Sequence, residues 1–327
     1  MLTALYSSMI ALVWRPGQRT KGIRRQGFAR CAETLALAVC AWSLGQPMQA
    51  AAANMVVEAV QLPTWVERQG QRWPAQPGQQ LRDNDKAVTA DGARMLLRLP
   101  DRSVIKLGEQ TQFQIETLVA RQPGAAGPAE IQSSLRLITG VFRYATDFTS
   151  KVLGHKRELN LKLATATVGI RGTDFWSMTD AEHDAVCVFD GSVAVERADK
   201  PEITLDKPGA FWVVFTGQPE KAAGQATPDQ LAKFIGQAEM KPGSGVLLQG
   251  GRWRAVVGQP TSATEAAALR LRLRTAGYPA VLVIKNGLHE VRINQLATRE
   301  DAETVLAQLQ ATPQLAVTQG RVTFVSE

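Results

Sequence analysis

The sequence predicts a mainly β N-terminal domain followed by a smaller α+β domain with the ferredoxin-like order βαββαβ. Two observations carry this prediction. From about Val56 to Phe215, short segments of alternating apolar residues are separated by turn dipeptides, and none has a helical period. From Val246 onward, a strand, a capped turn and an amphipathic helix occur twice, and the matching caps Ser262 and Thr298 are 36 positions apart.

The first domain shows its strands through alternation and turn chemistry. Apolar and polar residues alternate over 159–163, which indicates a half-buried strand. Asp190-Gly191 separates the apolar runs 186–189 and 193–195, a pattern that predicts a tight β-hairpin. Short strands of this kind are typical of a sandwich, a barrel or a coil, and the pattern leaves these three open.

Residues 217–245 are expected to link the two domains, which gives a first domain over 54–216 and a second over 246–327. The linker should contain one short helix, with Thr227 as its N-cap and Gln230 completing a capping box. Glycines then make 242–245 a flexible joint.

The duplicated unit defines the second domain. Ser262 and Thr298 are followed three residues later by the carboxylates Glu265 and Asp301, as helix N-termini require. Gly277 should end the first helix. The expected strands are 252–257, 280–284, 290–293 and 320–325. The expected buried stripes of the two helices are Ala266, Leu269 and Leu273, and Ala302, Val305 and Leu309.

Residues 1–53 have the order of a secretory signal peptide. A basic stretch precedes an apolar run over 34–44, and small residues follow at 50–53, where cleavage is expected. The apolar run is too short for a spanning helix, which needs roughly 20 residues. The leader holds six basic residues and one acid, so its removal lowers the net charge from +7 to +2 and removes the case for a nucleic-acid partner. The mature chain is therefore expected in the periplasm, without a membrane span.

The sequence predicts no catalytic, metal or cofactor site. Cys187 is the one cysteine outside the leader and lies among apolar residues, which favours a buried structural thiol. The three histidines are scattered, and His183 is too far from Cys187 along an extended strand for both to hold one metal. No nucleophile elbow or phosphate-binding loop occurs, so we expect a binding protein and not an enzyme.

The stretch Ala164–Phe175 and the later Val188–Val195 resemble the FecR-type periplasmic domain. The resemblance spans about 56–215, with Ala166 where the family tends to have proline. It implies structural roles for one set of residues, namely Gly169, Arg171, Gly172, Thr173, Asp190 and Gly191.

Arg171 is bracketed by glycines, which favours a guanidinium tucked into the fold and paired with Asp174 or a loop carboxylate. Contact between Arg171 and a ligand is the alternative. The family also includes envelope signalling regulators, which makes that role the alternative function.

The segments 253–258, 276–280 and 291–294 resemble the SPOR domain, a βαββαβ module that binds peptide-free glycan strands of peptidoglycan, often at division sites. The resemblance covers 251 to about 325. Strand alternation places four residues on the sheet face that the helices leave open, and Asn294 follows them on the last of these strands. The glycan-binding candidates are Arg254, Val256, Glu290, Arg292 and Asn294.

This chain departs from the SPOR pattern where polar groups are common. Val256 stands at the usual glutamine position and Asn294 at the second glycine, while Pro260 and Leu296 replace aromatic residues. The resemblance therefore implies weak binding to glycan strands. The expected function is an exported scaffold that docks to the cell wall, with a signalling regulator or an accessory of a peptidoglycan enzyme complex as alternatives.

Overall fold

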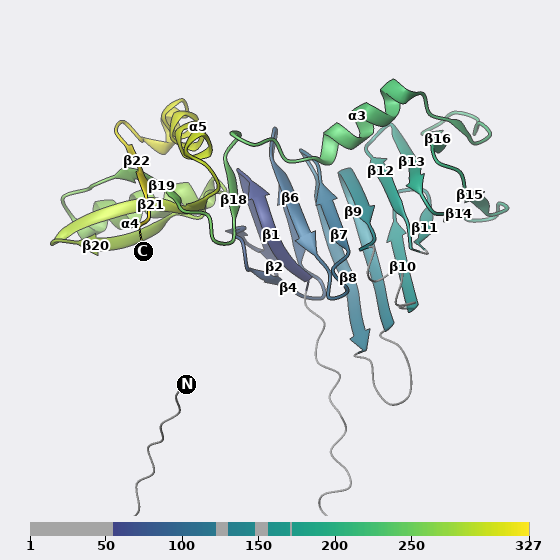
Figure 1. Cartoon of the computed structure of the whole chain (residues 1–327), viewed down its shortest axis with the longest axis horizontal. Helices are drawn as coiled ribbons and strands as arrows, with labels where there is room; N and C mark the ends of the chain where they lie inside the picture. The colour runs from purple at the N-terminus through teal and green to yellow at the C-terminus, as the bar shows by residue number, and fades with distance from the viewer. Residues whose placement is uncertain (1–54, 122–129, 148–155, 171, 327) are drawn as a thin grey trace, which may run out of the picture. The chain divides into compact units, whose positions relative to one another are not determined.

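The computed structural model describes residues 55–121, 130–147, 156–170 and 172–326. The expected signal peptide, residues 1–53, lies outside this part of the chain. The described residues form one compact unit. The strands up to β17 build two layers, as Figure 1 shows. Of the sandwich, barrel and coil that the sequence left open, the chain therefore forms the sandwich.

The first sheet runs from β4 at one edge to β17 at the other, and its neighbouring strands are antiparallel. In spatial order it contains β4 (Gln80–Leu81), β1 (Met55–Gln61), β6 (Arg94–Arg98), β7 (Val104–Leu107), the second part of β9 (Glu130–Ala145), β12 (Asp174–Thr179), β13 (His183–Asp190), β16 (Ala210–Phe215) and β17 (Gly224–Gln225).

The second sheet is also antiparallel, except where β9 and β10 run parallel. In spatial order it contains β3 (Gln71–Pro74), β2 (Thr64–Arg68), β5 (Lys86–Thr89), β8 (Gln112–Arg121), the first part of β9, β10 (Lys156–Lys162), β11 (Thr167–Ile170), β14 (Val193–Glu196) and β15 (Ile203–Leu205).

The long strand β9 belongs to both sheets and bends at Gly140. Its residues up to Thr139 pair with β8, and those from Gly140 onward pair with β12. Gly140 has φ +98°, and an added Cβ would lie 2.3 Å from Thr111 Oγ1. Only glycine allows both this backbone conformation and this close approach.

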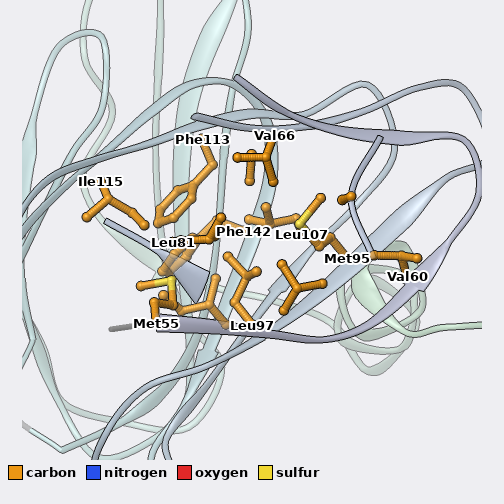
Figure 2. Packing of buried hydrophobic residues seen from close by; sticks show 14 of the residues in the cluster. Met55, Val60, Val66, Leu81, Met95, Leu97, Leu107, Phe113, Ile115 and Phe142 are labelled. Carbon is orange, nitrogen blue, oxygen red and sulfur yellow. The ribbon is translucent and has the colours of Figure 1, made fainter. Parts of the chain in front are cut away.

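The core lies between the two sheets and is apolar (Figure 2). Phe113 of the second sheet packs against Phe142 of the first, with ring centroids 5.6 Å apart, and Phe142 continues to Phe175 at 5.7 Å. Leu159 and Leu161 are at most 1% exposed, which confirms the half-buried strand expected over 159–163. Each such side chain stabilises the fold by about 1.5–3 kcal/mol through burial alone.

The prediction of a hairpin at Asp190-Gly191 is wrong. The chain does turn there, but β13 pairs with β12 and β16 in the first sheet, whereas β14 pairs with β11 and β15 in the second. The turn is a corner between sheets. Asp-Gly chemistry specifies a sharp reversal, and it does not specify which strand the emerging segment joins.

Helix α3 (Pro228–Ala238) covers part of the outer face of the first sheet. Its Thr227–Gln230 capping box is present as expected. Phe234 stacks on Trp176 of β12 at a centroid distance of 4.1 Å. The helix therefore packs on the sheet through an aromatic contact that its sequence alone did not reveal.

The C-terminal elements have the expected ferredoxin-like arrangement. The sheet order is β20-β21-β19-β22, with antiparallel neighbours throughout. Both helices bury the apolar stripes that the repeat predicted, and Gly277 has the left-handed φ expected after the first helix. The elements are β19 (Trp253–Gly258), α4 (Ala263–Thr275), β20 (Val281–Lys285), β21 (Leu288–Leu296), α5 (Arg299–Gln310), a 3₁₀ turn (Pro313–Leu315) and β22 (Arg321–Phe324).

Strand β18 (Val246–Leu248) connects the two sheet systems. It pairs with β1 of the first sheet over Ala59–Gln61, and its Leu247 pairs with Leu296 of β21. The amides of Gly245 and Val246 both donate to the buried Asp301 carboxylate, at 3.0 and 2.9 Å. Backbone pairing and a buried carboxylate therefore fix the chain from Gly245 onward.

Candidate functional site

The open face of the C-terminal sheet is the face opposite the buried residues Ala255, Val257 and Ile293, which join the helices in the core. Strand pairing aligns residues across this face: Val256 of β19 lies between Arg292 of β21 and Arg321 of β22. Paired residues of an antiparallel sheet share a face, so both arginines lie over this surface.

Five polar side chains of this face form two groups through direct contacts. Arg254 Nε donates to Asn294 Oδ1 at 3.1 Å. The Glu290 carboxylate accepts from Arg321 Nη2 at 2.6 Å, and its other oxygen lies 3.5 Å from Arg292 Nη1. We call Arg254, Arg292, Arg321, Glu290 and Asn294 the arginine cluster.

The cluster brings together four of the five residues expected to bind glycan, but two of the five are buried. Val256 and Glu290 are each 2% exposed. We expected Glu290 to contact sugar hydroxyls itself, but both of its oxygens already accept from arginines. Glu290 instead orients two guanidinium groups, and Val256 forms apolar floor beneath long side chains.

Donors remain free on this face. Among the described residues, Arg292 Nε and Thr323 Oγ1 are buried without a hydrogen-bond partner. Thr323 pairs with Arg254 in register, so it faces the same side. Three arginines against one carboxylate leave the arginine cluster positively charged. Burial first, and then the neighbouring charge of Arg292, lower the pKa of Arg254.

Arg321 was not among the sequence candidates, although its side chain is 49% exposed and completes the cluster. The signal was present in the expected strand 320–325, whose alternation puts Arg321 on the open face. Beside it, Gln259 and Gln319 help line a shallow depression of about 350 Å³. Amide side chains at such a rim can donate to and accept from sugar hydroxyls.

The FecR-like motif packs the corner between the two sheets. Gly172 has φ +71° and Gly191 has φ +83°. A Cβ added at Gly191 would lie 2.9 Å from the Gly172 carbonyl oxygen and from Thr173 Cγ2. Asp190-Gly191 therefore lies directly against Gly172 and the buried Thr173, which supports structural roles for these positions.

The predictions for Gly169 and Arg171 have different outcomes. Gly169 lies inside β11, paired with Asn160 and Ala194, and has no left-handed φ. Arg171 lies outside the described residues, so its expected burial stays a prediction.

Asp174, the expected partner of Arg171, forms a bidentate pair with Arg143, at 2.9 and 2.8 Å. Arg143 also contacts Glu239, just after α3, at 2.7 Å. These contacts raise the pKa of Arg143, with the Asp174 hydrogen bonds as the largest cause. Sequence reasoning missed this group because its members are far apart in the chain.

The remaining reactive side chains have structural surroundings. Cys187 is fully buried, as expected, and burial raises the pKa of its thiol to about 12. His183 contacts Asp180 at 3.0 Å and stacks on Phe215. Within the described ranges, no group of three metal-ligating side chains comes together, and no helix is long and apolar enough to cross a membrane.

Comparisons with known proteins identify the two parts of the chain. Residues 85–194 match the family model of the FecR protein, and residues 249–318 match the SPOR domain. Curated proteins give no significant match.

Two crystal structures of a candidate anti-sigma factor from Parabacteroides distasonis ATCC 8503 are similar to this chain. The first shares 16% identity, covering 46% of this chain and 64% of that one, with a TM-score of 0.35. The second shares 15% identity, covering 69% and 90%, also with a TM-score of 0.35. From the two family matches, the chain contains a FecR domain followed by a SPOR domain.

Proposed function

We propose that this protein is an exported, non-catalytic scaffold of the cell envelope whose SPOR domain docks to the glycan strands of peptidoglycan. The observation that carries the proposal is the arginine cluster on the open face of a sheet that matches the SPOR domain. Docking at division sites and a periplasmic location belong to the same proposal. So does the division of the chain into a leader (1–53), a FecR domain (54–216), a linker (217–245) and a SPOR domain (246–327).

The charge of the cluster favours peptide-free strands. Glycan strands carry lactyl carboxylates, which become free acids once the stem peptides are removed. Guanidinium groups bind carboxylates through paired, charge-assisted hydrogen bonds. Arg292 and Arg321, oriented by Glu290, are placed to do so, while Asn294 and Thr323 can meet hydroxyl and N-acetyl groups.

Co-sedimentation of the mature chain with peptide-free peptidoglycan tests the proposal. Arg292→Gln should weaken binding by about 10–100-fold, because a hydrogen bond to a charged group contributes about 1.5–3 kcal/mol. Arg299→Gln is the matched control, because Arg299 lies on α5 with its side chain 69% exposed. Equal sedimentation of the two variants would contradict a site on the open face.

A role in envelope signalling is the second candidate, and the FecR match over 85–194 favours it. An accessory role in a peptidoglycan enzyme complex is a further variant of the scaffold. Mass spectrometry of the protein from its native host distinguishes the exported scaffold from the signalling regulator. A chain that begins between Ala51 and Asn54 supports the exported scaffold, whereas an intact leader in the membrane fraction supports the signalling regulator.

A further inference from the structure

A pocket of about 560 Å³ lies between the FecR and SPOR domains, away from the open face. The FecR side contributes Arg94 and the turn at Asp91, and the SPOR side contributes Tyr278, Thr304 and Gln308. Pockets of about 300–1,000 Å³ with a few convergent polar groups are typical of small-molecule sites.

Arg94 is the unusual residue of this pocket. It is 4% exposed, so its charge is largely withdrawn from water. Its Nη1 donates to the carbonyl of Gly92 at 3.1 Å, and its Nε is buried without a partner. Among the described residues, no carboxylate forms an ion pair with it. A buried arginine without a counter-charge is unfavourable, and an anionic ligand would relieve that state.

The acids near Arg94 have other partners. Asp91 accepts from Gln110 Nε2 at 3.2 Å, and Glu109 accepts from the amide of Gly92 at 2.9 Å. Both carboxylates therefore hold the turn between β5 and β6. Lys241, which is exposed, also lines the pocket, so two basic side chains and these two acidic ones share the lining, and Arg94 is the one among them that is buried without an ion pair.

The SPOR side of the pocket offers neutral polar groups. Gln308 Oε1 is buried without a hydrogen-bond partner among the described residues. It can accept from a hydroxyl or an amide, and the largely buried Tyr278 ring gives an apolar wall. A ligand with one carboxylate and several hydroxyl groups matches both sides.

We propose that this pocket binds a small carboxylate-bearing sugar, with the carboxylate on Arg94 and the sugar hydroxyls toward Gln308. The choice of sugar rests on the proposed function, because N-acetylmuramic acid is the carboxylate sugar of peptidoglycan. A ligand here contacts residues of both matched domains, so its binding also stabilises their contact.

Calorimetric titration of the mature chain with N-acetylmuramic acid tests the proposal, with the neutral N-acetylglucosamine as the matched ligand. The acid should bind at least tenfold more tightly than the neutral sugar, and Arg94→Gln should remove this preference. Failure of the wild-type chain to prefer the acid would overturn the proposal.

Gln308→Glu serves as a second variant, since Arg94→Gln can disturb folding. It places a carboxylate in the pocket, so it should weaken binding of N-acetylmuramic acid at least tenfold and raise the melting temperature. Unchanged affinity in a folded Gln308→Glu protein would contradict the assignment.

Arg292→Gln separates this site from the open face. If the variant loses sedimentation but keeps the Arg94-dependent titration, the pocket is a site of its own. If Arg292→Gln abolishes the titration and Arg94→Gln does not, the acid binds at the open face and the pocket proposal fails. If wild-type sedimentation fails while the Arg94-dependent titration persists, the proposed function fails and the pocket stands.

Discussion

Gly140 is the position at which β9 passes from one sheet to the other, and we expect it to tolerate no side chain. In Gly140→Ala, the left-handed φ of +98° should cost about 1–3 kcal/mol as backbone strain. The added Cβ would also meet Thr111 Oγ1 at 2.3 Å and its Cα at 2.5 Å, and overpacking of this kind costs about 1–3 kcal/mol. The two effects together predict a loss of about 2–6 kcal/mol.

Thr111 cannot move away cheaply. It is fully buried, and its hydroxyl accepts from the amide of Val141 at 3.0 Å. Urea unfolding followed by tryptophan fluorescence measures the change in free energy. Gly217→Ala is the control, because Gly217 has φ +72° with nothing within 4 Å of an added Cβ, which leaves strain of about 1–2 kcal/mol. Equal destabilisation of the two variants would refute the close packing at the sheet switch.

Two further predictions concern titratable groups of the FecR domain. Contacts with Lys162 first, and then Ser134 and Arg136, lower the pKa of Glu116 to about 2 from an ordinary 4.5. The stability that Glu116 contributes is present above pH 4.5 and is lost as pH falls toward 2. In Glu116→Gln, the free energy of unfolding should therefore fall less steeply between pH 4.5 and 2 than in the wild type. An unchanged pH dependence in this range would exclude the role. The buried Cys187 thiol, whose pKa is raised to about 12, should resist Ellman's reagent at pH 8 in the native mature chain and react once unfolded in urea; rapid native reaction would show an accessible thiol.

Much of the C-terminal domain could be predicted because its signals are local. Helix caps such as Thr298 and the three- and four-residue spacing of buried side chains depend only on neighbours in the chain. The β-sandwich was harder. Alternation locates its strands, but the hairpin that Asp190-Gly191 predicts is wrong, because a turn does not encode which sheet receives the next strand.

The candidate site was predictable only in part. Alternation placed Arg254 and Arg292 on one face correctly, since a strand's period of two is fixed by its backbone. It could not show that Glu290 is buried by contacts with Arg321, because that ion pair joins strands 31 residues apart. The sequence likewise could not show that Arg94 is buried without an ion pair, because this depends on where the fold places the neighbouring carboxylates.

Site-specific photo-crosslinking tests the central claim most directly. A photoreactive residue at Thr323, on the open face beside Arg254, should crosslink the mature chain to peptide-free glycan strands. The same residue at Leu271, an exposed position of α4 on the helix side, should give little product. Crosslinking at Leu271 that equals or exceeds that at Thr323 would contradict docking through the open face.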